Sequence, residues 1–286
     1  MKVYGNRFFL VPCALLFLVL SSTNLIFGQN NLKKSDWSSL FQGIDLATGE
    51  SEEPLQKVYI LRIDTQANGI SFYSTGRNDN FEDNVNETNR QTVVDFLKEN
   101  NLAVAVNANF YNPFTSFTQR NPGPSNVIGL AISEGVVVST TAEGFPSFIV
   151  HKDGTKEIRS VSSDESLDHI QTAVSGNKII LQNGEVLVQE DKSRHPRTGL
   201  GISEDNRFVY LMTIDGRQEG YSNGATYEEV GNWLKEFGSY NGLNLDGGGS
   251  TTMVQRDSDG SPKILNRHSG VLRHNANAIG VRALAL

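Results

Sequence analysis

The sequence has almost no cysteine. Its single cysteine, Cys13, lies inside an apolar run near the N-terminus, so the rest of the chain has no thiol. This excludes a disulfide framework, a cysteine-ligated metal and a thiol nucleophile there. A chain of this length does not need disulfides, because it can bury a large hydrophobic core. The chain also lacks an H-E-x-x-H motif, an EF-hand loop and a G-x-G-x-x-G turn after a strand. These absences argue against zinc-protease chemistry and against nicotinamide or flavin cofactors.

Long hydrophobic runs and excess positive charge are also absent from most of the chain. The one long apolar run, residues 8–20, follows Lys2 and Arg7 and precedes Gly28, an order typical of a secretory signal peptide. The run is too short to span a bilayer well, so we expect residues 1–28 to be cleaved rather than kept as an anchor. Cleavage removes two of the 25 basic residues and none of the 32 acidic ones, which leaves residues 29–286 with a net charge of −9. We therefore expect a secreted or periplasmic protein with no stable membrane anchor and no nucleic acid partner.

Short apolar stretches separated by turns dominate residues 29–286. The turns that predict β-hairpins are Glu134-Gly135, Asp153-Gly154 and Asn183-Gly184. Two segments, 88–100 and 226–237, have the apolar spacing of a helix behind a capping-box pattern. No internal repeat or interdomain linker is visible. We predict a single α+β domain over residues 29–286, with a mixed β-sheet core, hairpins and two or more packed helices.

The most unusual stretch surrounds Asp246, which ends a short apolar strand. Gly247, Gly248 and Gly249 follow it, and then come Ser250 and Thr251. Three consecutive glycines add nothing to packing and cost backbone entropy, so the main chain must need a positive φ or close approach of another group. Amides exposed in such a bend can bind an anion, and the carboxylate beside them can transfer a proton or hold charge. The alternative is a tight turn capped by an aspartate.

A second aspartate, Asp215, ends an apolar strand in the same way and precedes Gly216 and Arg217. A predicted helix joins this strand to the one that ends at Asp246, and such crossovers favour parallel neighbours. We therefore expect both aspartates at the same edge of the sheet, where ligands gather in such folds. The alternative is that Asp215 only caps its turn.

Asparagines close two other apolar stretches. Asn107 and Asn109 follow the run 102–106, which predicts a buried central strand, and Asn244 directly precedes the strand end at Asp246. Buried amides need hydrogen-bond partners. These side chains therefore either bind a ligand or close the loops around it.

Three arginines, Arg197, Arg217 and Arg273, are the cationic candidates for the site. A guanidinium group matches phosphate oxygens in a bidentate way, so the three indicate an anionic ligand. The alternative for each is a surface ion pair. The nearby histidines are expected to be loop or packing residues rather than catalysts; they are His195, His268 and His274.

Together these stretches resemble the phosphodiester glycosidase family, in content and in order. The stretches that carry the resemblance are Val106-Asn107-Ala108-Asn109-Phe110-Tyr111, Arg197-Thr198-Gly199-Leu200-Gly201, Asp215-Gly216-Arg217, Tyr221-Ser222 and Asn244-Leu245-Asp246-Gly247-Gly248-Gly249-Ser250-Thr251-Thr252. The resemblance implies hydrolysis of a sugar, N-acetylglucosamine or a related one, joined through its anomeric carbon to a phosphodiester. The products are the free sugar and a phosphomonoester. It also implies a phosphorylated glycan or sugar phosphate as partner.

The residues suggest roles in that reaction. We expect Asp246 to act at the anomeric carbon, with Asp215 as its partner and Glu219 as a substitute for either. The arginines are expected to stabilise the phosphate that leaves. The full set of predicted substrate or phosphate contacts is Arg197, Thr198, Arg217, Arg273, His274, Asn107, Asn109, Ser222, Asn244, Gly247, Gly248, Gly249, Ser250 and Thr251.

Two other functions stay open at this point. Residues 220–224 fit the G-x-S-x-G pattern of serine hydrolases, with Ser222 as nucleophile, although no strand-to-helix turn is predicted at the serine. A non-catalytic phosphoglycan-binding module would keep the same arginines and glycine bend. No cofactor is assigned with certainty; Asp215, Asp246 and Asn244 offer the oxygen ligands that Ca²⁺ or Mg²⁺ accepts. The sequence predicts no oligomeric state.

Overall fold

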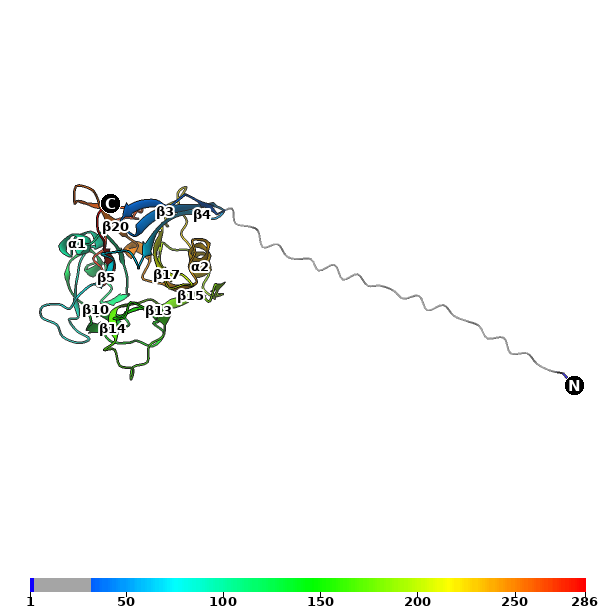
Figure 1. Cartoon of the computed structure of the whole chain (residues 1–286), viewed down its shortest axis with the longest axis horizontal. Helices are drawn as coiled ribbons and strands as arrows, with labels where there is room; N and C mark the ends of the chain where they lie inside the picture. Colours follow the sequence, from blue (N-terminus) through cyan, green and yellow to red (C-terminus); the bar gives the residue numbers. More distant parts are fainter. Residues whose placement is uncertain (3–31) are drawn as a thin grey trace. The chain divides into compact units, whose positions relative to one another are not determined.

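The computed structural model describes residues 1–2 and 32–286, so the predicted signal peptide lies outside the described residues except for its first two. Residues 32–286 belong to one compact unit (Figure 1). The domain boundary at residue 29 stays a prediction. No helix in the described part of the chain has both the length and the apolar character needed to cross a membrane.

Four antiparallel sheets make up most of the fold. The largest has nine strands: β1 (Lys33–Lys34), β2 (Ser38–Phe41), β3 (Ile44–Glu52), β4 (Leu55–Asp64), β15 (Lys178–Gln182), β16 (Glu185–Val186), β17 (Arg197–Ile202), β18 (Phe208–Ile214) and β19 (Asn241–Asn244). A five-stranded sheet contains β5 (Ser71–Ser74), β7 (Val104–Asn107), β20 (Met253–Arg256), β21 (Pro262–Ile264) and β22 (Ala278–Arg282). A second contains β10 (Ala131–Ser133), β11 (Val136–Ser139), β12 (Ser147–His151), β13 (Lys156–Arg159) and β14 (Ile170–Ser175). The smallest sheet contains β6 (Thr88–Arg90), β8 (Tyr111–Asn112) and β9 (Gly123–Val127).

Helices are few, so the predicted α+β class with a mixed sheet is wrong. Within residues 32–286 there are two α-helices, α1 (Val93–Glu99) and α2 (Tyr227–Glu236), on opposite sides of the strands in Figure 1. Two short 3₁₀ turns, η1 (Thr118–Arg120) and η2 (Gly248–Ser250), complete the helical structure there. The three predicted hairpins are present as β10–β11, β12–β13 and β15–β16, and they add antiparallel rather than mixed pairing. Every strand pair in the described residues is antiparallel, and two short helices are too few to make an α+β layer over so many strands.

One of the two predicted helix starts is also wrong. Residues 88–90 form strand β6, and α1 begins only at Val93, with the Thr92 side chain accepting a hydrogen bond from the Asp95 amide. The polar residues that suggested a capping box here form β6, an outer strand of the three-stranded sheet. The second capping box is confirmed: Thr226 and Glu229 satisfy each other's main-chain amides at the start of α2.

The strands that end in aspartates are not neighbours. β17 lies between β18 and β19 and pairs with both in antiparallel register, so the predicted direct parallel pairing is wrong. Because each pairs with β17, however, β18 and β19 run in the same direction. Arg197 at the start of β17 pairs with Ile214 at the end of β18, and β19 ends beside it. The three chain segments that carry Arg197, Asp215 and Asp246 therefore meet at one edge of the nine-stranded sheet.

Helix α2 packs closely on the face of β17 and its neighbours. Val230, Trp233 and Leu234 join a buried cluster with residues of the sheet. The strand glycines make this approach possible: a Cβ at Gly199 would lie 3.0 Å from Val230 Cγ1, and one at Gly201 would lie 2.3 Å from Ser239 Oγ. The opposite face of the sheet packs on the sheet of β7 and β22 through a second, larger core cluster.

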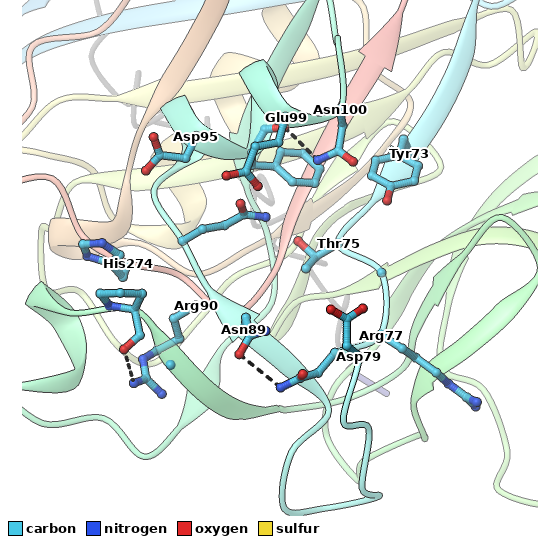
Figure 2. Close-up of a pocket in the computed structure, with 16 residues that line it drawn as sticks. Tyr73, Thr75, Arg77, Asp79, Asn89, Arg90, Asp95, Glu99, Asn100 and His274 are labelled. Atoms are coloured by element: carbon cyan, nitrogen blue, oxygen red, sulfur yellow. Dashed lines mark hydrogen bonds between the residues drawn. The ribbon is translucent and has the colours of Figure 1, made fainter.

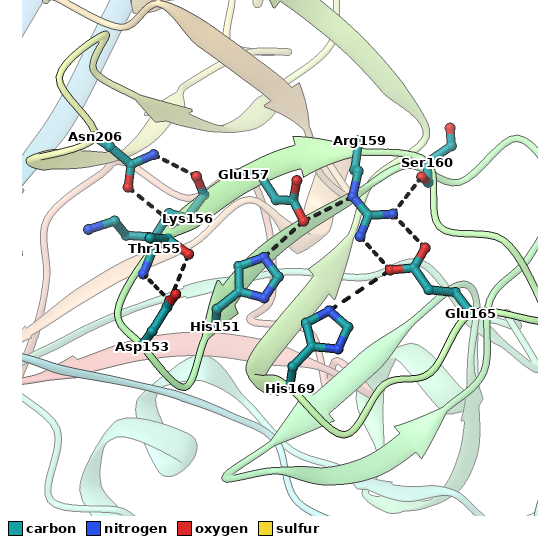
Figure 3. A network of polar contacts seen from close by, with 10 residues as sticks. All are labelled: His151, Asp153, Thr155, Lys156, Glu157, Arg159, Ser160, Glu165, His169 and Asn206. Atoms are coloured by element: carbon teal, nitrogen blue, oxygen red, sulfur yellow. Dashed lines mark hydrogen bonds and ion pairs between the residues drawn. The ribbon is translucent and has the colours of Figure 1, made fainter.

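A polar network ties the β12–β13 hairpin to the loop that follows it (Figure 3). The Arg159 guanidinium pairs with Glu165 and, at 2.9 Å, with Glu157 Oε1, which also contacts His151 Nε2 at 2.9 Å. The His151 and His169 rings stack with centroids 5.0 Å apart. These groups are partly exposed, so each pair adds little free energy, and the network fixes the hairpin rather than forming a site.

The close approach of the chain after α2 to β17 predicts a large effect of Gly201→Ala. The added methyl group would meet the buried Ser239 side chain at 2.3 and 2.8 Å, and overpacking of this kind costs about 1–3 kcal/mol of unfolding free energy. Urea unfolding measures the change. The matched control is Gly76→Ala, whose new methyl group meets nothing nearer than Tyr73 Oη at 3.5 Å. Equal stability of the two variants would contradict this account of the packing.

Candidate active site

A cavity of about 640 Å³ opens at the edge where β17 begins and β18 and β19 end. It brings together six predicted site residues from four separate stretches of the sequence: Arg197, Arg217, Asp246, Gly247, Gly248 and Arg273. Its other lining residues are Phe110, Tyr111, Phe114, Ile128, Asp191, His195 and Tyr227. Aromatic walls, one buried carboxyl group and several cations therefore surround a single space.

A larger hollow, about 840 Å³, lies between α1 and β6 (Figure 2). Asp95 and Glu99 of α1 line one side of it, and Arg77 and Asn89 line the other. Of the predicted site residues, only His274 lines this hollow. We take the smaller cavity as the candidate active site, because the predicted carboxyl group and cations converge there.

Asp246 is held in a fixed position and is almost completely buried, with 7% of its surface exposed. Its main-chain amide donates to the Ala108 carbonyl at 2.9 Å, and the Gly247 amide donates to its Oδ1 at 2.9 Å. Burial raises the pKa of the Asp246 carboxyl to about 6, against the opposing effects of Ser250, Arg273 and the Gly247 amide. A carboxyl with this pKa changes its charge near neutral pH, as catalytic acids and bases do.

Asn107 and Thr198, both predicted as ligand contacts, hold Asp246 instead. Asn107 Nδ2 donates to the Asp246 carbonyl at 2.6 Å, and Asn107 Oδ1 accepts from Thr198 Oγ1 at 2.8 Å and from the Thr252 amide at 3.2 Å. All four residues of this arrangement are buried. The Asn107 side chain therefore joins β7, β17 and the glycine bend.

The other two predicted asparagines also have protein partners. Asn109 donates to main-chain carbonyls, including that of Leu130 at 3.2 Å, and accepts from the Ser175 amide at 3.0 Å. Asn244 Nδ2 donates to Asn177 Oδ1 at 2.8 Å. The structure thus places these amides in loop-closing contacts, the alternative that the sequence left open.

The glycine bend is needed for close approach of two arginines. A Cβ at Gly248 would lie 3.3 Å from Arg217 Nη1, and one at Gly249 would lie 2.6 Å from Arg273 Cζ. At Gly247 it would lie 2.7 Å from the Pro196 carbonyl oxygen. The Gly248 amide donates to that same oxygen at 2.8 Å. The amides of Gly247 and Gly248 are therefore already used, and the bend positions guanidinium groups rather than cradling an anion with these two amides.

None of the three arginines around the cavity forms an ion pair with a carboxylate in the part of the chain that the structure describes. Arg197 Nε donates to the Ala225 carbonyl at 3.0 Å, and its guanidinium lies 4.0 Å from the centre of the Tyr227 ring. Arg273 lies over the Phe114 ring at 5.2 Å. Burial, together with Arg273 and Arg197, lowers the pKa of Arg217. The positive charges therefore repel one another, and a bound anion would relieve that repulsion.

His195, which the sequence assigned to a loop role, contacts this group of charges. Arg217 Nη2 donates to His195 Nδ1 at 3.2 Å. Burial, with Arg197 and Arg217 close by, lowers the pKa of His195. The imidazole is therefore neutral at pH 7 and acts as an acceptor that helps to orient Arg217.

Asp215 does not line the cavity. It is 1% exposed, and its carboxylate accepts from Asn266 Nδ2 and from the Arg267 amide, both at 2.9 Å. Burial raises its pKa, and these hydrogen bonds oppose the rise. The carboxylate joins the loop after β18 to the loop after β21. This places Asp215 as a support for the segment that carries Arg217.

Glu219 and Ser222 also lie outside the cavity lining. Glu219 is exposed on the turn after Arg217. Ser222 is completely buried, and its hydroxyl donates to the Asp215 carbonyl at 2.5 Å. This geometry gives Ser222 no open path to a substrate, so it does not support the serine-hydrolase alternative. Ser250 and Thr251 are buried behind the bend.

Tyr111 is a site residue that the sequence reasoning missed. Its side chain is 3% exposed, lines the cavity, and has a hydroxyl without a hydrogen-bond partner among the described residues. Burial, with Asp246 adding to it, raises the pKa of Tyr111 to about 12, so the group stays a neutral donor. The available signal was its position at the end of the Asn107–Tyr111 motif, because a buried tyrosine normally has a partner for its hydroxyl.

The predicted metal ligands do not converge. Asp215 is engaged outside the cavity, and no cluster of three or more His, Cys, Asp or Glu side chains suited to a metal ion occurs in the described residues. We therefore assign no metal to this site on the donor set that the structure shows.

Comparisons with known proteins concern the family and the fold rather than the individual site residues. The family model described as phosphodiester glycosidase matches residues 100–282. The chain is 29% identical over 184 residues to the SPbeta prophage-derived uncharacterized protein YomE of Bacillus subtilis, covering 57% of this chain and 26% of that protein. It is 26% identical over 188 residues to mouse N-acetylglucosamine-1-phosphodiester alpha-N-acetylglucosaminidase, covering 58% of this chain and 34% of that protein. The match thus spans about a quarter to a third of these relatives.

Solved structures share the fold. The zebrafish N-acetylglucosamine-1-phosphodiester alpha-N-acetylglucosaminidase catalytic domain, auto-inhibited by its pro-peptide, aligns with a TM-score of 0.63 at 20% identity, over 87% of this chain and 83% of that one. A hypothetical protein from Synechocystis aligns with a TM-score of 0.59 at 14% identity, over 84% of this chain and 62% of that one. At these identities the likeness concerns the fold alone.

Burial of the Asp246 carboxyl predicts that Asp246→Asn stabilises the fold above pH 6. The Asp246 carboxyl has a pKa of about 6 in the folded protein and an ordinary value of 3.8 in the unfolded chain. The folded protein therefore loses stability as the pH rises from 3.8 to about 6. The asparagine removes a penalty of up to about 3 kcal/mol. Thermal unfolding at pH 7.5 should show a higher midpoint for the variant. At pH 3.5 the advantage should be absent; an advantage of equal size there would contradict this electrostatic origin.

Proposed function

The chain belongs to the phosphodiester glycosidase family, and from that premise we propose that it hydrolyses the anomeric bond of a sugar-1-phosphodiester. The sugar is N-acetylglucosamine or a closely related one. The bond between the anomeric carbon and the bridging oxygen breaks, water supplies a hydroxyl group to the carbon, and the oxygen stays on phosphorus. The products are the free sugar, a phosphomonoester and a proton.

The observation that carries this proposal is the set of guanidinium groups without carboxylate partners beside a buried carboxyl group. Arg197, Arg217 and Arg273 line one cavity with Asp246. Guanidinium groups suit phosphate oxygens, and they stabilise the second negative charge that develops as the monoester leaves. Because phosphate leaves as an anion, this reaction does not depend on a general acid in the way that departure of an alkoxide does.

Asp246 acts as an ionised carboxylate at the anomeric carbon. It either contacts the carbon directly or takes a proton from the attacking water. Its protonated form predominates below pH 6, because the pKa is about 6. Asn107 and Thr198 are positioning residues for Asp246, and Asp215 is a positioning residue for the Arg217 segment. The Tyr111 hydroxyl donates to a sugar or phosphate oxygen in the cavity.

We also propose that residues 1–28 direct export and that residues 29–286 form the domain that carries this activity. The basic start, the apolar run and Gly28 support export, as described above. The chain matches only part of its curated relatives. The substrates of those relatives therefore suggest which compounds to test and do not identify the substrate of this chain.

The proposed roles predict loss of turnover in Asp246→Asn. With the methyl phosphodiester of N-acetylglucosamine-1-phosphate as substrate, release of N-acetylglucosamine should fall by roughly 10²–10⁴-fold, because a positioned proton-transfer or charge-stabilising group is removed. Asp259→Asn, in an exposed turn, is the control. Equal activity of wild type and Asp246→Asn would end the assignment. Binding of the substrate without turnover by either protein would favour the non-catalytic module.

The raised pKa of Asp246 predicts the pH dependence of the reaction. Since the ionised form is required, kcat/KM of the wild type should rise as pH increases through about 6 and then level off. The measurement is a kcat/KM profile from pH 4.5 to 8 on the same substrate. The residual activity of Asp246→Asn should not show this step. A profile that falls through the same pH range would mean that the protonated carboxyl is the active form.

A further inference from the structure

A second cavity, about 440 Å³, lies on the other side of the arginines. It shares Arg217 and Arg273 with the candidate active site, so these two side chains form a wall between the spaces. The glycine bend also lies between the two cavities. Gly247 and Gly248 line the candidate active site, and Gly249 lines the second cavity. The remaining lining residues are Gln119, Arg120, Ser269, Gly270 and Val271.

The two spaces differ in charge and in lining. The candidate active site has Asp246, Asp191 and four aromatic residues in its wall. The second cavity has no carboxylate and no aromatic residue in its lining. A sugar ring suits the aromatic side, where the carboxyl group that acts on the anomeric carbon also lies. The second cavity is therefore the space that the leaving group would occupy.

The number of cations exceeds what one phosphodiester needs. Arg217 and Arg273 line both cavities, so two guanidinium groups are already available for the single negative charge of a phosphodiester. Arg120, at the end of η1, adds a third guanidinium group to the second cavity. No ion pair of Arg120 occurs among residues 32–286. A cluster of cations that form no ion pair in the described residues favours a ligand with more than one anionic group.

We propose that the second cavity binds a leaving group that itself carries a second phosphate group, and that Arg120 recognises this group. The proposal rests on the proposed function, because it takes the shared wall as the place of the phosphate that is cleaved from the sugar. Arg217 and Arg273 contact that first phosphate, and Arg120 contacts the second. Arg120 thereby determines specificity for the leaving group.

A matched pair of substrates tests this proposal. One is the ethyl phosphodiester of N-acetylglucosamine-1-phosphate, and the other is the same compound with a phosphate at the far carbon of the ethyl group. The wild type should prefer the phosphorylated compound about tenfold or more in kcat/KM, which corresponds to about 1.4 kcal/mol. Arg120→Gln should reduce this ratio to near one. Added salt should also reduce the wild-type ratio, because it screens exposed charges.

Arg77→Gln is the matched control, because Arg77 is another exposed arginine but lines the hollow beside α1. This variant should keep the wild-type preference. Equal kcat/KM for the two substrates in the wild type, or a preference that survives Arg120→Gln, would overturn the proposal while leaving the proposed function intact.

A binding measurement separates the two proposals if the wild type hydrolyses neither substrate. That result would refute the proposed function. Calorimetric titration with ethyl phosphate and with ethane-1,2-diyl bisphosphate would then show whether the second cavity still binds a second phosphate. Tighter binding of the bisphosphate that is lost in Arg120→Gln supports the site; equal binding of the two compounds overturns it.

Discussion

The side chain of Asn107 makes the contacts on which the geometry of the site depends. It lies at the end of β7 in one sheet, accepts from Thr198 of β17 in another sheet, and donates to the main chain of Asp246. A buried amide is stable only when its donors and acceptors are satisfied, so the three segments are held in one relative position. The two sheets need no direct strand pairing at this point. The carboxyl group is fixed by the core rather than by a flexible loop.

Holding charged groups in this position costs free energy, both at the buried carboxyl group and at the arginines around it. Asp246 is buried where its charged form is disfavoured, and three arginines face the same cavity without carboxylate partners. Main-chain carbonyls, aromatic rings and the neutral His195 hold these arginines in place. Each of these partners orients a guanidinium group without neutralising it. The fold thus keeps positive charges that repel one another in the cavity, and an anionic substrate would reduce that repulsion. Destabilising groups of this kind are common at functional sites.

Gly247, Gly248 and Gly249 show how one sequence feature serves both cavities. Side chains there would meet Pro196, Arg217 and Arg273. The bend therefore lets two guanidinium groups lie against bare main chain, with Asp246 on one side and the second cavity on the other. Similar close approach at Gly199 and Gly201 lets α2 and the chain after it pack on β17. In both places the glycines allow close contact and do not themselves carry the chemistry.

The sequence by itself determined the local features: the hairpin turns, the capping box at Thr226, the strand ends at Asp215 and Asp246, and the glycine bend with its arginines. Periodicity and turn chemistry act between residues that are close in the chain, so a single sequence records them. Only the tertiary structure decided that β17 separates β18 from β19, that Asp215 supports a loop outside the cavity, and that Tyr111 lines it. The same holds for Asn107, whose partners Thr198 and Asp246 are 91 and 139 residues away. Hydrogen bonds of this kind form only when distant segments pack together. The spacing of residues along the chain therefore does not predict which residues will be partners.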